Sequence, residues 1–184
     1  MANKILTPVT LWNDFDDSLP LNVEVKKEYA KEKAQFRILG FSGRAVGSER
    51  VRISALYAFP KGNANCPSLL VLPDADKTFD EALAERFVSK GYAVFMPDYR
   101  GEWEGSGEHT IYPQTVSYGN FRNAGRRFTH ADDTAKETSW YEWTAVARYS
   151  LKCLQNLCGD KPIGVIGIKA GGDIAWQVAA TAGG

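Results

Sequence analysis

The first part of the chain alternates hydrophobic and polar positions, as strands with one buried face do. Residues 51–59 show this alternation most clearly, because every second residue is apolar. Residues 23–29 and 34–39 also have strand character, although charged residues interrupt both segments. A Pro-Lys-Gly-Asn turn follows the third segment. We therefore expect the chain to begin with antiparallel strands.

The rest of the chain alternates short apolar runs with amphipathic segments. The apolar runs are typical of strands buried on both faces and cover residues 68–72, 92–96 and 162–168. Helical spacing follows each run, at residues 80–90, 139–157 and 172–182. This order predicts an α/β fold with helices on both faces of a mostly parallel sheet. We expect the three runs to be parallel neighbours, with residues 92–96 at one side and residues 102–136 forming an excursion over the sheet.

The composition is that of an ordinary globular protein, with 44% hydrophobic and 24% charged residues among 184. This length suits one domain over residues 1–184. Lysine plus arginine equals aspartate plus glutamate, at 22 each, which argues against a nucleic-acid partner. No apolar run approaches the ~20 residues that cross a bilayer, so we expect no membrane association. Three cysteines and no leader-like N-terminus indicate reduced thiols and a cytoplasmic location.

The most informative motif is Gly167-x-Lys169-x-Gly171, between a β-branched run and an apolar helical segment. A nucleophile elbow has this form: a sharp strand-to-helix turn lifts the nucleophile above the sheet, and glycines relieve the crowding around it. Gly167, Gly171 and Gly172 are the expected elbow glycines, and Lys169 occupies the nucleophile position. We predict a tight turn with positive φ at Lys169. Its side chain should point toward a loop that contains Asp74.

Other segments resemble the α/β-hydrolase superfamily over roughly residues 51–184. Residues 69–74, a following helix, and residues 89–101 with the Asp98-x-Arg100-Gly101 bend are similar to its strand, helix, strand and bend. The closest likeness is to the acetyl xylan esterase and cephalosporin C deacetylase group, which is dienelactone-hydrolase-like; residues 136–143 resemble an aromatic-rich segment of that group.

The resemblance implies a truncated α/β-hydrolase fold and descent from carboxylic-ester hydrolases that deacetylate sugars or small molecules. It implies a small ester or sugar-acetate ligand and no cofactor. The backbone amides of Ala170 and Ala75 take the oxyanion-hole positions. Asp98 and Arg100 are expected to pair and brace the bend.

The sequence departs from that pattern in three places. Lys169 replaces the serine, and Pro73-Asp74-Ala75 stands where a His-Gly-aromatic stretch is usual. The triad acid and histidine segments that follow the nucleophile in the family do not follow it here. His109 and His130 both precede the elbow. We therefore expect no triad hydrolysis, although a desolvated lysine with a lowered pKa could itself act as a nucleophile.

Two alternatives remain open at this point. Asp74-Ala75-Asp76-Lys77-Thr78 matches the D-x-D-x-T pattern of haloacid-dehalogenase-type phosphatases, in which Asp74 and Asp76 would hold Mg²⁺. The remainder of that pattern is poor, since Asp132-Asp133 follows no apolar strand, and we expect no metal site. The other alternative is a non-catalytic binding or interaction module that self-associates through an incomplete sheet edge.

Overall fold

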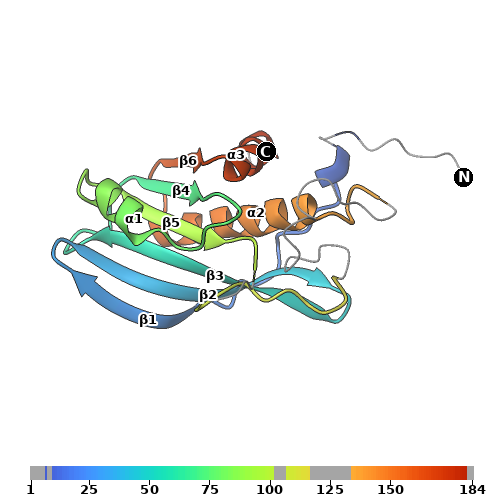
Figure 1. Cartoon of the computed structure of the whole chain (residues 1–184), viewed down its shortest axis with the longest axis horizontal. Helices are drawn as coiled ribbons and strands as arrows, with labels where there is room; N and C mark the ends of the chain where they lie inside the picture. Colours follow the sequence, from blue (N-terminus) through green and yellow to red (C-terminus); the bar gives the residue numbers. More distant parts are fainter. Residues whose placement is uncertain (1–6, 8–9, 102–106, 117–133, 182–184) are drawn as a thin grey trace, which may run out of the picture.

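The computed structural model describes residue 7 and residues 10–101, 107–116 and 134–181 (Figure 1). Its centre is a six-stranded sheet in the order β1-β2-β3-β5-β4-β6. The strands are β1 Glu24–Lys31, β2 Ala34–Val46, β3 Glu49–Pro60, β4 Ser68–Leu72, β5 Ala93–Asp98 and β6 Ile163–Gly167. The neighbours from β1 to β5 are antiparallel, whereas β4 is parallel to both β5 and β6. The sheet is therefore mixed, and the predicted parallel trio with β5 at one side is confirmed.

The helices also follow the predicted order. They are the short 3₁₀ helix η1 Thr10–Trp12 and the α-helices α1 Glu81–Val88, α2 Ser139–Cys158 and α3 Ala170–Thr181. Asp80 caps α1, because its carboxylate accepts a hydrogen bond from the Leu83 amide at 2.9 Å. Thr138 caps α2 in the same way, through the Tyr141 amide at 3.0 Å. None of the described helices is long and apolar enough to cross a bilayer.

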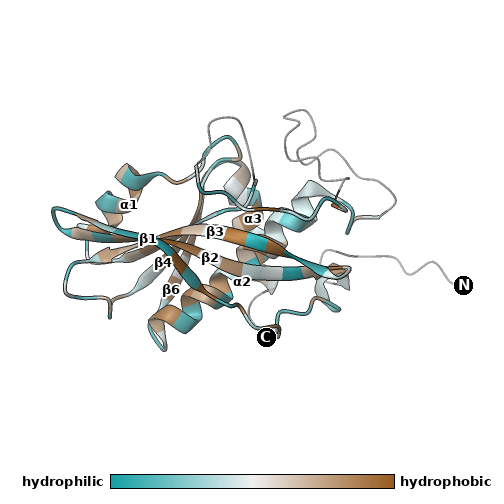
Figure 2. Ribbon diagram, turned by 90° about the horizontal axis from the view of Figure 1, so that it is seen from below, coloured by the Kyte–Doolittle hydropathy of each residue, from teal (hydrophilic) through white to brown (hydrophobic). Residues whose placement is uncertain are grey.

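Helices cover both faces of the sheet. On one face, α2 and α3 pack side chains such as Trp143 and Ile174 against the sheet. On the other face, α1 contributes Ala84 and Val88. β3 supplies residues to both cores, so it is buried on two faces rather than one. Figure 2 shows the hydrophobic stretches along β2 and β3 that result.

The carboxyl ends of β4 and β6 lie side by side, and this brings two loops together. Leu72 pairs with Gly167 in the parallel register, and the Ile168 amide donates to the Leu72 carbonyl at 3.0 Å. Residues 73–76 follow β4 and are called here the β4 loop. Residues 167–172 follow β6 and are called the elbow. Both lie at the end of the sheet order opposite β1, where β6 leads into α3 (Figure 1).

Candidate functional site

The elbow is a tight turn, as predicted. Lys169 has φ of 49°, and the only other residue except glycine with positive φ in the described ranges is Asn22. The Gly171 amide donates to the Ile168 carbonyl at 2.9 Å, and the Gly172 amide donates to the Lys169 carbonyl at 2.8 Å. A positive φ costs a residue other than glycine about 1–3 kcal/mol. The surrounding structure therefore holds Lys169 in this conformation.

Two of the three elbow glycines are required by close backbone contacts. A Cβ at Gly167 would lie 2.3 Å from the Gly171 carbonyl oxygen, and one at Gly171 would lie 2.1 Å from the Leu72 carbonyl oxygen. The prediction that Gly172 also enforces the turn is wrong. A Cβ there would lie 3.8 Å from the nearest atom, the Gly167 carbonyl oxygen, because Gly172 faces away from the strand ends.

Lys169 forms an ion pair with the β4 loop. Its Nζ lies 3.0 Å from Asp74 Oδ2, so the predicted direction of the side chain is confirmed. The Lys169 side chain is 77% exposed, whereas that of Asp74 is 12% exposed. The hydrogen bond and charge of Asp74, together with the charge of Asp76, raise the pKa of Lys169. Lys169 is therefore a hydrated ammonium group at neutral pH and not a desolvated amine.

The Asp74 carboxylate is an anion with several donors. Burial acts to raise its pKa, but the hydrogen bonds from Lys169 and from the Ala75 amide outweigh burial, and the pKa is lowered. The Ala75 amide lies 2.8 Å from Asp74 Oδ1. A smaller contribution comes from a hydrogen bond of the Ala170 amide. The donors include both amides that were expected to form the oxyanion hole.

The bend after β5 positions the β4 loop. The Tyr99 hydroxyl donates to the Pro73 carbonyl at 2.5 Å, and Arg100 Nη1 donates to the Ala75 carbonyl at 3.0 Å. Both side chains are buried. Sequence reasoning assigned Arg100 to the bend alone and missed Tyr99. The available signal was a large aromatic residue inside a bend that follows a buried strand.

Asp98 braces the bend through backbone groups. Its Oδ1 accepts from the Gly101 amide at 3.2 Å, and its Oδ2 accepts from the Thr110 amide at 2.7 Å. Burial raises the pKa of Asp98 to about 6, although these amide hydrogen bonds act in the opposite direction. Asp98 and Arg100 were expected to pair with each other. The hydrogen bonds described here connect each of them to backbone groups instead.

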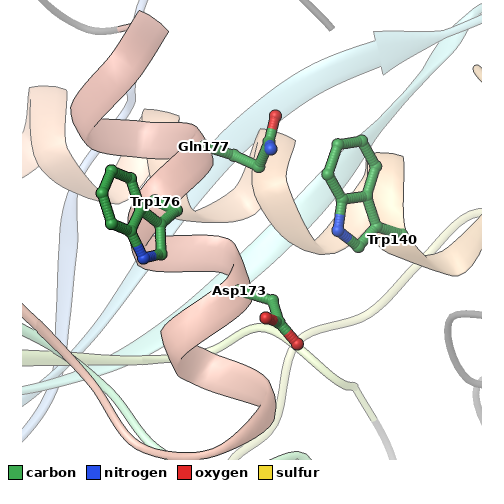
Figure 3. Close-up of a pocket in the computed structure, with 4 residues that line it drawn as sticks. All are labelled: Trp140, Asp173, Trp176 and Gln177. Carbon is green, nitrogen blue, oxygen red and sulfur yellow. The ribbon is translucent and has the colours of Figure 1, made fainter.

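A shallow groove with tryptophan walls lies beside the elbow. It is formed by Trp140 of α2 and by Asp173, Trp176 and Gln177 of α3. Figure 3 shows Asp173 and Gln177 on the side of α3 that faces Trp140, and Trp176 on another side of the helix. Trp176 is 78% exposed. Sequence reasoning missed this groove, because the apolar character of residues 172–182 indicated a helix packed against the sheet.

The remaining candidates do not gather at the elbow. His109 lies at residues 107–116, with its Nδ1 2.8 Å from the Gly107 carbonyl oxygen. His130 and the Asp132-Asp133 dipeptide lie outside the described residues. Within the described ranges, no group of three or more His, Cys, Asp or Glu side chains is placed to hold a metal ion. Asp76 is exposed, and Asp74 is held by Lys169.

Comparisons with known proteins agree with this geometry. Residues 53–184 match the model of the Dienelactone hydrolase family. Acetyl xylan esterase 1 from Thermoanaerobacterium sp. JW/SL YS485 has a TM-score of 0.61 at 19% identity, over 89% of this chain and 50% of that one. Glucuronoyl esterase from Solibacter usitatus has a TM-score of 0.53 at 16% identity, over 88% and 50%. A cold-adapted esterase from an Arctic intertidal metagenomic library has a TM-score of 0.53 at 16% identity, over 88% and 59%.

At these identities the structural likeness shows the fold alone. It confirms the expected α/β-hydrolase fold, and this chain spans about half the length of the first two structures. A comparison with curated proteins gives no match.

Proposed function

The chain belongs to the Dienelactone hydrolase family, and from this premise we propose that it is a hydrolytically silent member. The family gives it carboxylic-ester-hydrolase ancestry. The observation that carries the proposal is the ion pair at the elbow: Lys169 Nζ lies 3.0 Å from Asp74 Oδ2 at the position of the nucleophile. A protonated amine has no free electron pair with which to attack an ester.

The surroundings of Lys169 are opposite to those of a nucleophilic lysine. Such a lysine needs desolvation or a cationic neighbour, and both lower its pKa. Lys169 is instead exposed and lies near two carboxylates, which raise its pKa. Acyl transfer to this amine should therefore be slow at neutral pH. The same argument covers stoichiometric acylation as well as turnover.

A ligand of the ancestral class remains a reasonable proposal for this surface. We expect a small ester or sugar acetate to approach from the groove that holds Trp140 and Trp176, since it adjoins the elbow. Removing a nucleophile abolishes most of the rate enhancement of a hydrolase, but binding contributions persist without it. Weak ligand binding without turnover is the expected behaviour.

Hydrolysis of p-nitrophenyl acetate tests this proposal. The purified chain and the variants Lys169→Ala and Lys161→Ala should all release p-nitrophenol at the background rate. Lys161 is a suitable control, because it is an exposed lysine that precedes β6. Mass spectrometry of the treated protein should show no preferential acetylation of Lys169. Repeated turnover that Lys169→Ala abolishes and Lys161→Ala preserves would overturn the proposal.

A further inference from the structure

We infer that Asp74 is an internal anion that fills the oxyanion position of the elbow and closes it to small carboxylates. This inference deepens the proposed function and rests on it. It assigns the elbow an autoinhibitory contact between two loops. It also names the ligand class that the position would accept if the contact were removed: a monocarboxylate such as acetate.

The first support is the convergence of donors from two loops on one carboxylate. The Ala75 amide of the β4 loop lies 2.8 Å from Asp74 Oδ1, and the Ala170 amide of the elbow also hydrogen-bonds to the carboxylate. Lys169 Nζ lies 3.0 Å from Oδ2. Backbone amides that converge from separate loops are the arrangement that stabilises an oxyanion. Here the negative charge that they surround belongs to the protein.

The second support is that the frame around Asp74 is rigid. The Ile168 amide donates to the Leu72 carbonyl at 3.0 Å, which ties the elbow to the end of β4. Gly171 packs so closely on that carbonyl that no side chain fits. Tyr99 and Arg100 hold the carbonyls of the β4 loop on its other side. The amides therefore have little freedom to move away from the carboxylate.

The third support is the size of the group that would be removed. Replacement of Asp74 by alanine deletes one carboxylate and leaves its three donors in the same frame. A free monocarboxylate supplies the same two oxygens and the same charge, so it can occupy the vacated space. Asp76 lies two residues away in the same loop and is exposed, which makes Asp76→Ala a matched control.

Acetate binding followed by amide NMR tests the inference. Acetate should shift the Ala75 and Ala170 amide resonances of Asp74→Ala saturably, with Kd on the order of 1–10 mM for so small a ligand. The native chain and Asp76→Ala should bind at least about tenfold more weakly at these amides. The double variant Asp74→Ala, Lys169→Ala should lose most of the gain. Equal binding by the native chain would overturn the inference, as would a folded Asp74→Ala that binds no acetate.

A second measurement uses the native chain, so that it does not depend on the folding of a variant. In a pH titration, the Asp74 carboxyl carbon and the Ala75 and Ala170 amides should respond with one shared midpoint. Separate midpoints would show that the amides do not contact this carboxylate. The outcome is distinct from that of the ester assay. Turnover with acetate binding as expected overturns the proposed function alone, whereas silence without acetate binding overturns this inference alone.

Discussion

Gly171→Ala is the perturbation that most severely tests the packing of the elbow. The new Cβ would lie 2.1 Å from the Leu72 carbonyl oxygen and 2.5 Å from the Pro73 carbonyl oxygen. Contact at an ordinary distance of 3.4 Å requires a displacement of about 1.3 Å. Both oxygens belong to the backbone, and the Leu72 carbonyl also accepts the hydrogen bond of Ile168. Neither can move without breaking the contact between β4 and the elbow.

We expect Gly171→Ala to lower the free energy of unfolding by about 3 kcal/mol or more, at the upper end of the overpacking range. This corresponds to a fall in Tm of roughly 6–12 °C for a chain of this size. Gly172→Ala is the matched control, because its Cβ would lie 3.8 Å from the nearest atom and Gly172 is helical. Alanine there should raise stability by about 0.5–1 kcal/mol.

Urea unfolding of the native chain and both variants measures these differences, provided that the m-values agree. The glycine argument predicts opposite signs for the two variants. A loss of less than about 0.5 kcal/mol in Gly171→Ala, within the range of ordinary surface substitutions, would refute it. Equal losses in both variants would refute it as well, because helix propensity and not the strand contact would then explain the data.

Three further predictions concern other parts of the molecule. Glu142→Ala should cost about 3–5 kcal/mol, because Glu142 is fully buried and its Oε2 accepts from Arg44 Nε at 2.7 Å; a small loss in urea unfolding would contradict this. Asp98 has a folded pKa of about 6, above the ordinary value of ~3.9, so the stability it contributes is present below about pH 4 and lost as pH rises through about 6. Stability relative to Asp98→Asn should therefore fall over that interval, and parallel pH profiles would count against the assignment. If the β6 edge self-associates, Trp176→Ser should weaken the dimer in sedimentation velocity, since Trp176 lines the groove beside β6; a monomeric native chain would end that proposal.

The sequence predicted the elbow well because its geometry is set locally. Two glycines flank Lys169 at a spacing that only a sharp turn requires, and the close contacts of Gly167 and Gly171 are the reason. The approach of Lys169 to Asp74 was also predictable. The two segments follow parallel strands, whose carboxyl ends meet at one edge of a sheet.

Other features depend on contacts between distant segments, which no local pattern reveals. The helix α3 begins at Ala170 and not at residue 172, because packing against β4 holds two glycines in a helix that they would not favour alone. The pair of Arg44 and Glu142 joins β2 to α2 across most of the chain. The strand β2 continues to Val46, beyond the predicted end at residue 39, because pairing with β3 sustains it past two glycines.

The central claim is that the elbow carries an ammonium–carboxylate pair in place of a nucleophile. An NMR titration of the Lys169 ε-methylene group tests it most directly. The account predicts a pKa above that of an ordinary lysine, ~10.4, and a fall toward that value in Asp74→Asn, because the hydrogen bond and charge of Asp74 raise it. A Lys169 pKa below the ordinary value, unchanged in Asp74→Asn, would contradict the claim and indicate an amine that is free to react.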